Sequence, residues 1–345
     1  MKILNLCTNH LDRPMGYNFK SLHLSWKVED AQGCTDKHTK VVVSEDDAFE
    51  NIVYESQEYV RYGMPYMDID ISLKPETRYY WKVTVEDDAS VASASTWFET
   101  GKENNWQGQW IGVKTQTVSM PEIYRYFNAE KKVKSARLYA YGLGLYEAYI
   151  NDEKIGDEYL SPGYHSYDLM MEYQTFDATD LIRAGENKLS FILGDGWYKG
   201  RFVFEGGFEN IYGDERCVIA ELHIKYEDGT TQVIATDEQF KAKETVIKSN
   251  SIYDGEVIDE TAPLEELTLK TVDMSYELLQ PRLNPPIRAV EKIEAVSLIN
   301  SEKGELIIDF GQIITGWVTF DLPEQGEYFV KLRYGEVLQD GCFYN

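Results

Sequence analysis

Apolar and polar side chains alternate strictly in the stretch SLHLSWKVE, residues 21–29. Leu22, Leu24, Trp26 and Val28 fall on one side of an extended chain, and the polar residues between them fall on the other. This period of two predicts a half-buried β-strand and favours an antiparallel sheet with one face in water. The stretch therefore indicates an all-β fold.

The same pattern recurs further along the N-terminal part of the chain. Tyr79, Trp81, Val83 and Val85 share one face of a predicted strand at residues 79–86. A short apolar run, KVVV at 40–43, and a proline-containing turn, LKPET at 73–77, precede it. Short strands at this spacing within about 100 residues predict a small sandwich resembling fibronectin type III, which we assign to residues 1–104.

A second all-β domain is predicted for residues 105–280. Its clearest hairpin pairs residues 220–226 with the strand that follows Asp228-Gly229, a dipeptide that tolerates the positive φ angles of a tight type I′ turn. Another turn is predicted at Asn151-Asp152. This region is too long for a minimal sandwich, so we expect a larger one decorated with loops.

A third domain is predicted for residues 281–345. Residues 264–279 leave room for a short helix, whereas QPRLNPP at 280–286 cannot continue a helix and predicts an extended linker. Alternation then predicts strands at 317–322 and 328–334. The sequence thus predicts an all-β chain of tandem antiparallel β-sandwiches, of which we expect the third to be truncated.

The bulk composition narrows the classes of function. With 345 residues, 43% hydrophobic and 27% charged, the chain has the composition of a soluble globular protein of two or three domains. No apolar run approaches the roughly 20 residues that span a bilayer, so we expect no membrane-spanning role. A net charge of −25 repels phosphodiester backbones and anionic membrane surfaces, which makes nucleic acid and membranes unlikely partners.

The N-terminal sequence and the spacing of the cysteines favour a reducing compartment. The N-terminus turns polar at Thr8-Asn9-His10 and lacks the apolar stretch of a secretory signal, so cytoplasmic localisation is the expectation. The four cysteines are too far apart for a zinc ribbon or a redox pair. We expect four free thiols, at positions Cys7, Cys34, Cys217 and Cys342.

Familiar catalytic motifs are missing from the sequence. There is no Gly-x-Ser-x-Gly elbow, phosphate loop or His-Glu-x-x-His helix, and Gly142-Leu143-Gly144 lacks the third glycine of a dinucleotide fingerprint. The five histidines are scattered, which argues against a histidine-based metal site. Glycoside hydrolysis needs two placed carboxyl groups, but among 59 Asp and Glu residues the sequence singles out no pair.

The most specific stretch is GDGWYKGR, residues 194–201. Its glycines permit a sharp turn that would present Trp197 and Tyr198 with Asp195 and Arg201 to a sugar, which has one apolar face and a ring of hydroxyls. The alternative is a structural corner with an aromatic residue in the core, and the residues alone favour it. The same holds for the tyrosines that could line a cleft, for which core packing is the better interpretation: Tyr139, Tyr141, Tyr146, Tyr149, Tyr164, Tyr167 and Tyr173.

Several motifs in a fixed order resemble a known family. AYINDEKIGDEYLSPGY at 148–164, YQTFDATDL at 173–181, GEN at 185–187 and the 194–201 motif look like the N-terminal β-sandwich of bacterial α-L-rhamnosidases. Upstream, LKPETRYYWKV at 73–83 resembles the preceding fibronectin-like domain. Downstream, the chain follows the family order into a concanavalin-like sandwich through YDGE at 253–256, NPPIR at 284–288, DFGQ at 309–312 and GWV at 316–318.

The resemblance carries implications for activity. In this family an α/α barrel supplies the general acid and base of an inverting hydrolysis of terminal α-L-rhamnosides, and that barrel would follow Asn345. No residue of this chain inherits a catalytic role, so the chain alone is expected to be inactive. Its native partner would be its own catalytic domain, and its ligands would be rhamnose-containing glycosides. Some relatives carry a calcium-assisted rhamnose site, which would place calcium at Asp157 and Asp195 here; no cofactor is otherwise required.

Two other functions remain open at this stage. A free-standing lectin-like carbohydrate-binding module would bind sugar without any barrel. A complete small glycosidase would carry its own carboxylates on a β-sandwich. The reading frame after Asn345 separates the accessory role from the lectin, and activity of this chain alone would indicate the small glycosidase.

Overall fold

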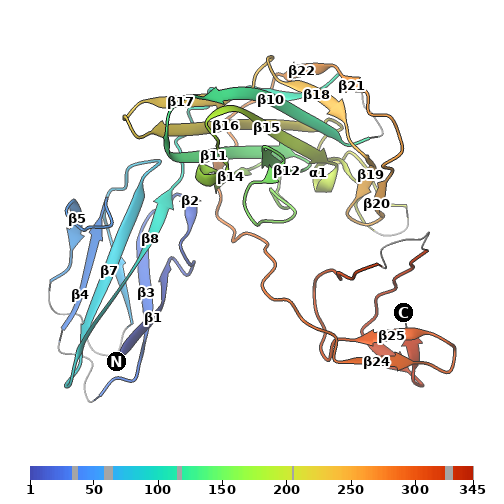
Figure 1. Cartoon of the computed structure of the whole chain (residues 1–345). Helices are drawn as coiled ribbons and strands as arrows, with labels where there is room; N and C mark the ends of the chain where they lie inside the picture. The colour runs from blue at the N-terminus through green and yellow to red at the C-terminus, as the bar shows by residue number, and fades with distance from the viewer. Residues whose placement is uncertain (33–37, 58–64, 115–118, 204–205, 323–328, 345) are drawn as a thin grey trace. The chain divides into compact units, whose positions relative to one another are not determined.

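The computed structural model describes residues 1–32, 38–57, 65–114, 119–203, 206–322 and 329–344. These residues are almost entirely strands and loops, as predicted (Figure 1). The chain divides into two compact units, Met1–Ile287 and Arg288–Asn345. The first unit contains two sandwiches, here called the first domain (1–104) and the second domain (105–287), and residues 288–345 are called the C-terminal unit.

The first domain contains two sheets. The smaller sheet has the strand order β1 (Lys2–Thr8), β3 (Leu22–Glu29), β6 (Tyr66–Ile69). The larger has the order β2 (Met15–Tyr17), β8 (Val91–Thr100), β7 (Arg78–Glu86), β4 (His38–Ser44), β5 (Ile52–Glu55). All neighbours pair antiparallel except β2 and β8, which are parallel. The strands predicted at 21–29, 40–43 and 79–86 are confirmed as β3, β4 and β7.

Tryptophans join the two sheets of the first domain. Trp81 of β7 is fully buried, and its ring centroid lies 6.5 Å from that of Trp26 on β3. Its indole Nε1 donates a hydrogen bond of 3.0 Å to Thr8 Oγ1 on β1. Because a buried indole N–H needs an acceptor, this bond fixes the distance between the sheets at the centre of the apolar core.

The second domain is a larger sandwich of two sheets (Figure 1). One sheet has the order β13 (Glu153–Lys154), β12 (Leu145–Ile150), β15 (Gly185–Gly194), β10 (Pro121–Ala129), β18 (Lys241–Glu244), β21 (Glu266–Leu267). The other has β22 (Leu269–Val272), β9 (Trp110–Val113), β16 (Cys217–Tyr226), β11 (Val133–Leu143), β14 (Met171–Asp177), β23 (Leu279–Pro281), with β17 (Thr231–Ala235) beside β16. Smaller elements are a 3-10 turn at Thr179–Leu181, helix α1 (Gly196–Lys199) and the hairpin of β19 (Ile247–Ser251) and β20 (Gly255–Ile258).

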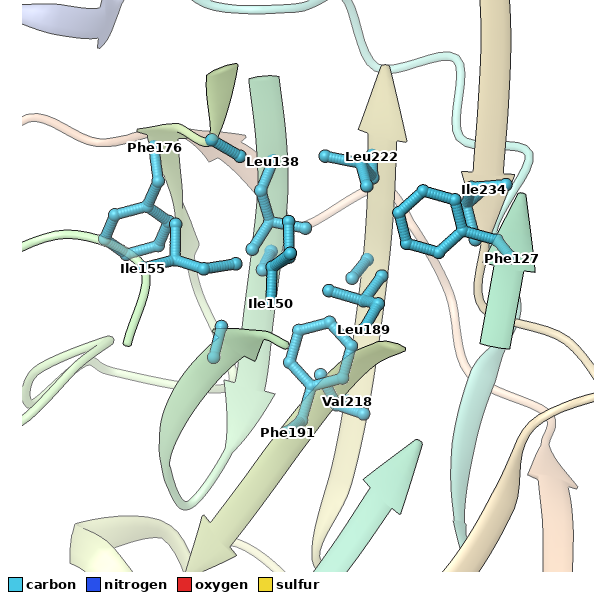
Figure 2. Packing of buried hydrophobic residues seen from close by; sticks show 14 of the residues in the cluster. Phe127, Leu138, Ile150, Ile155, Phe176, Leu189, Phe191, Val218, Leu222 and Ile234 are labelled. Atoms are coloured by element: carbon cyan, nitrogen blue, oxygen red, sulfur yellow. The ribbon is translucent and has the colours of Figure 1, made fainter. Parts of the chain in front are cut away.

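The seven-stranded sheet of the second domain is buried on both faces. Figure 2 shows the inner face, where Leu138 and Leu222 lie opposite Leu189 and Phe191 of the other sheet. The outer face carries Trp110 and a group of buried aromatic and aliphatic residues covered by loops. Core packing is therefore confirmed for five of the seven tyrosines singled out in the sequence: Tyr139, Tyr141, Tyr146, Tyr167 and Tyr173.

The two predicted turns differ in type. Asn151 and Asp152 both take positive φ, +54° and +65°, and join β12 to β13 by the two-residue loop that the sequence predicts. At the β16–β17 hairpin, Gly229 has φ +81° whereas the φ of Asp228 is not positive, and Gly229 N donates to Tyr226 O. The expected type I′ turn is therefore wrong there, because a single left-handed glycine closes a longer loop.

The segment between the second domain and the C-terminal unit also differs from expectation. Residues 264–279 form β21 and β22 rather than a short helix. The extended stretch after them is not a free linker, since β23 pairs parallel with β14. Residues 279–287 are called the exit segment below.

Buried carboxylates hold the exit segment on the second domain. Arg282 donates two hydrogen bonds, of 2.5 and 2.7 Å, to the carboxylate of Glu158, and both side chains are nearly inaccessible. Glu172 accepts hydrogen bonds from the backbone N–H of Leu283 and of Asn284. Asn284 in turn offers its carbonyl to the hydroxyl of Tyr17 in the first domain, at 2.9 Å.

The C-terminal unit contains two short hairpins, β24 (Ser297–Asn300) with β25 (Leu306–Asp309) and β26 (Val337–Gln339) with β27 (Cys342–Tyr344). The strands predicted at 317–322 and 328–334 are wrong for residues 317–322 and 329–334, which are irregular; Tyr328 lies outside the described residues. Alternation sets which side chains share a face, but a strand forms only where a neighbour takes its backbone hydrogen bonds.

Two further observations concern the predictions about membrane spans and cysteines. No helix of the described residues is long and apolar enough to cross a membrane. Cys7, Cys217 and Cys342 are free thiols as predicted, and Cys34 lies outside the described residues.

The exit segment yields a stability prediction. Replacing Glu158 with Gln leaves the Arg282 guanidinium buried without its counter-charge, so we expect unfolding of the second domain to require about 3–5 kcal/mol less free energy. The matched control is Glu227→Gln in the same domain, because Glu227 pairs with Lys132 at 3.7 Å on the surface and should contribute less than about 1 kcal/mol. Urea unfolding followed by tryptophan fluorescence measures both variants, and equal losses would contradict the buried pairing.

Candidate functional site

The 194–201 motif forms a tight corner at the end of β15. The chain leaves Gly194 and enters α1 with Gly196 at φ +56°. A Cβ at position 196 would lie 2.9 Å from the backbone N of Leu145, and one at position 194 would lie 2.8 Å from Asn250 Oδ1. Both positions therefore accept only glycine without displacing a neighbour, which explains the glycines of the motif.

Asp195 fastens this corner to the next strand of the opposite sheet. Its Oδ1 accepts a hydrogen bond of 2.6 Å from Nε of Arg216, the residue just before β16. The Arg216 side chain is 6% exposed and that of Asp195 is 20% exposed, so water weakens the pair little. Asp195 thus acts first as a structural anchor.

Arg201 makes a second ion pair, with the β19–β20 hairpin. Its Nε and Nη2 donate to the two carboxylate oxygens of Asp254 at 2.9 and 2.7 Å, and the guanidinium lies 5.1 Å from the ring centroid of Tyr253. The hydrogen bond from Arg201, supported by one from Ser251, lowers the pKa of Asp254. Asp195 and Arg201 are therefore paired with other residues rather than with each other.

The side chains of Trp197 and Tyr198 point in different directions because the two residues are neighbours on the helical turn α1. Tyr198 is 7% exposed and packs edge to face on Tyr167, with ring centroids 5.1 Å apart. Burial, followed by nearby acidic residues, raises the pKa of Tyr198 to about 12. The Tyr198 ring therefore packs against its neighbours at this corner, and its contact with sugar stays a prediction; Trp197 is only partly buried.

Trp197 belongs to a group of partly exposed rings that we call the aromatic patch, made of Tyr164, Trp197, Phe202 and Tyr212. The ring centroid of Tyr164 lies 6.2 Å from that of Trp197 and 5.7 Å from that of Phe202. The hydroxyls of Tyr164 and Tyr212 are 3.0 Å apart, and Tyr164 is 52% exposed. The patch thus offers ring faces and phenolic hydroxyls together, the combination that suits a small polyhydroxylated molecule.

The metal prediction is not supported by a formed site. Among the described residues, no group of three or more His, Cys, Asp or Glu side chains is arranged to hold a metal ion. Asp157 is exposed in the loop after β13, and the Asp195 carboxylate is engaged by Arg216. Calcium binding at Asp157 and Asp195 stays a prediction.

The 194–201 motif contains only some of the residues that the structure brings together at this corner. Trp197 lies in the patch, and Arg201 directly precedes Phe202. Reasoning from the motif missed Arg216, Asp254 and Tyr212, which are 21, 53 and 48 residues from their partners. Asp254 lies in the YDGE stretch already noted as a motif, which is the one signal that marks it.

Three family descriptions match this chain in order. Residues 3–104 match "Rha78A-like, N-terminal immunoglobulin domain", residues 131–291 match "Alpha-L-rhamnosidase N-terminal domain", and residues 299–345 match "Bacterial alpha-L-rhamnosidase concanavalin-like domain". Among curated relatives, an α-L-rhamnosidase of Alteromonas sp. (strain LOR) is 28% identical over 96% of this chain and 40% of the relative. One from Formosa agariphila is 30% identical over 77% of this chain and 32% of the relative.

Solved structures of α-L-rhamnosidases are also similar to this chain. The native α-L-rhamnosidase from Aspergillus terreus has a TM-score of 0.77 and 25% identity, covering 90% of this chain and 38% of that chain. The enzyme from Streptomyces avermitilis complexed with L-rhamnose has a TM-score of 0.75 over 90% of this chain and 49% of that chain; at 19% identity this likeness shows the fold alone. The chain spans less than half the length of each of these relatives.

The two ion pairs of the corner should differ in strength. In Asp195→Asn the nearly buried Arg216 loses a charged acceptor, so we expect the second domain to lose about 1–3 kcal/mol of stability. Asp254→Asn removes the charge of a carboxylate that is 58% exposed and should cost clearly less. Urea unfolding at low and high salt measures both. A larger loss for Asp254→Asn than for Asp195→Asn would refute the anchoring role of Asp195.

Proposed function

Since this chain belongs to the α-L-rhamnosidase family by the domains that it carries, we propose that it is the accessory N-terminal portion of an α-L-rhamnosidase. The observation that carries this is the ordered match of three domains, at 3–104, 131–291 and 299–345. In this proposal the whole protein hydrolyses terminal α-L-rhamnosides, and the described domains provide scaffold and sugar contacts.

The chemistry itself is proposed to lie outside these 345 residues. An inverting hydrolysis needs an acid and a base carboxyl about 6.5–9.5 Å apart with room for a water between them. The carboxylates described in the 194–201 corner are instead engaged by Arg216 and Arg201. In the proposal, a catalytic domain of the same protein supplies that pair and is the native partner of this chain.

The C-terminal unit supports the idea that more chain packs against it. Its apolar side chains are widely exposed, with Phe329 at 92% and Trp317 at 57%. Exposed apolar surface of this extent marks an interaction site. Since residues 299–345 match a concanavalin-like domain of the family, we propose that further strands of that domain cover these side chains.

We propose that the aromatic patch is the sugar contact of the second domain. Trp197 and Tyr164 would stack on the apolar face of a rhamnosyl ring, and the hydroxyls of Tyr164 and Tyr212 would bond its hydroxyls. Two or three such contacts give roughly millimolar to high-micromolar affinity after the entropic cost of association. Calcium would raise the affinity if Asp157 or Asp195 became a ligand, because hard cations take carboxylate oxygens.

The first test is activity. We expect this chain to show no steady hydrolysis of an aryl α-L-rhamnoside, because removing the acid–base pair removes the dominant chemistry. The assay follows release of the chromophore over hours and includes Asp195→Asn, which should leave the background unchanged. Steady turnover that Asp195→Asn abolishes would overturn the accessory role and indicate a small glycosidase.

The second test is binding. L-Rhamnose is titrated into the parent chain and into Trp197→Ala by NMR chemical-shift perturbation, with calcium and with a chelator. We expect at least about tenfold weaker binding in Trp197→Ala, since aromatic stacking supplies much of the contact energy. The control is Tyr126→Ala, which removes a 55% exposed ring from the outer face of β10 and should bind as the parent does.

Binding that survives Trp197→Ala unchanged, or no binding in any form, would leave the 194–201 motif as a structural corner only. Binding by a protein whose reading frame ends at Asn345 would instead favour a free-standing lectin-like module.

A further inference from the structure

His223 lies at the junction between the first and second domains and faces a carboxylate on each side. It points outward from β16, and its Nε2 is 2.8 Å from Glu221 Oε2 on the same strand. Its Nδ1 is 3.4 Å from Glu76 Oε2, which belongs to the turn before β7 in the first domain. The side chains are shielded, with 17% of His223, 28% of Glu76 and none of Glu221 exposed.

This arrangement requires a charged imidazole. A neutral imidazole has one N–H donor and one lone pair, so one of its nitrogens would place a lone pair against a carboxylate oxygen. Only the imidazolium donates to Glu76 and Glu221 at once. The geometry therefore links the protonation of His223 to the contact between the two domains.

The proton belongs on His223 rather than on Glu221. Glu221 also accepts hydrogen bonds from the backbone N–H groups of Gln107 and Gly108, and its Oε2 lies 3.4 Å from Lys102 Nζ. Burial opposes ionisation of Glu221, but these donors and His223 outweigh it and lower its pKa to about 2. Glu221 therefore stays a carboxylate at every pH at which His223 titrates.

Other charged groups face the same space. A cavity of about 110 Å³ separates the two domains here, and it has room for water. Tyr139 of β11 packs against the His223 ring, with centroids 5.1 Å apart. The charged groups that line the cavity besides Glu76 and His223 are Arg78, Glu99, Arg137 and Lys225, and Lys102 lies behind Glu221.

An ion-pair cluster lies beside His223 in the same junction, since Arg137 of β11 is the cross-strand neighbour of His223. Glu99 of the first domain accepts hydrogen bonds from Nε and Nη2 of Arg137, at 2.6 and 3.0 Å, and one of 2.9 Å from Nε of Arg78. Asp177 lies 2.8 Å from Arg137 Nη1.

We propose that His223 is a proton-dependent latch between the first and second domains. The imidazolium bridges Glu76 to Glu221 and closes the junction at the cavity. Loss of the proton leaves one ring nitrogen with a lone pair facing a carboxylate, so the bridge to Glu76 breaks and the contact loosens at His223, while the neighbouring Glu99 ion pairs still join the two domains. The protonation state of His223 therefore controls how rigidly the first domain is attached to the second.

The direction of the pH dependence follows from the two neighbours. Burial lowers the pKa of His223, but hydrogen bonds to Glu221 and Glu76 outweigh burial and raise it above the ordinary value of about 6.5. A raised pKa means that the contribution is fully present below about pH 6.5 and is lost as the pH rises through the folded-state pKa. The junction should therefore loosen on the alkaline side of neutrality.

The experiment titrates His223 and the junction together. NMR of histidine-labelled chain, with His223→Gln to assign the resonance, measures its pKa in the parent and in Glu76→Gln. Hydrogen exchange of the backbone at residues 76–78 and 221–225 is followed from pH 6 to 9, corrected for the intrinsic rate. His23→Gln is the matched control, because His23 Nδ1 pairs with Asp68 at 2.7 Å within the first domain alone.

We expect a His223 pKa above 6.5 that falls by about half a pH unit or more in Glu76→Gln, since a carboxylate at this range favours the charged ring. We expect corrected exchange at the junction to rise about threefold or more with pH in the parent and in His23→Gln, but not in His223→Gln. A His223 pKa at or below 6.5, an unchanged pKa in Glu76→Gln, or the same pH response in His223→Gln would each overturn the latch. None of these outcomes depends on sugar binding.

Discussion

The double burial of the seven-stranded sheet is the constraint on which the second domain depends. Its inner face meets the six-stranded sheet, and its outer face is covered by loops through Trp110 and the buried tyrosines. Three neighbouring parts attach to this outer face. Tyr198 anchors the 194–201 corner, Leu279 anchors the exit segment, and the hydroxyl of Tyr173 donates to the carbonyl of Lys102 in the interdomain link at 2.7 Å.

Apolar burial places these parts, and buried charges orient them. A hydrophobic contact has no preferred direction, whereas a carboxylate with two donors fixes both distance and angle. The exit segment follows this rule with Arg282 and Glu158, and the interdomain junction follows it with Glu99 and its two arginines. Burying a charge costs free energy, so loss of one partner leaves the other charge unpaired and strongly destabilises the junction. The junctions therefore favour one specific arrangement of the parts that they join.

The sequence predicted what depends on local pattern and missed what depends on distant partners. Alternation found β3 and β7 because a period of two is encoded residue by residue. It failed at 317–322, where the side chains alternate but the described structure forms no strand. Likewise the 194–201 motif marked Trp197, yet pairs such as Arg201 with Asp254 or His223 with Glu76, 147 positions apart, arise only from the packing of sheets. No local pattern distinguishes those carboxylates among 59 acidic residues.

The aromatic patch inherits its geometry from these two kinds of support. On its inner side, Tyr198 and the shielded Asp195–Arg216 pair lie on the doubly buried sheet and hold α1 in one position. On its outer side, Arg201 reaches a hairpin whose Asp254 is 58% exposed, and exposed ion pairs are screened by salt. One side of the patch is therefore held by buried contacts, and the other side is held by an ion pair that salt weakens. In the proposed sugar site, the firmly held side would position Trp197 against the ring of the sugar.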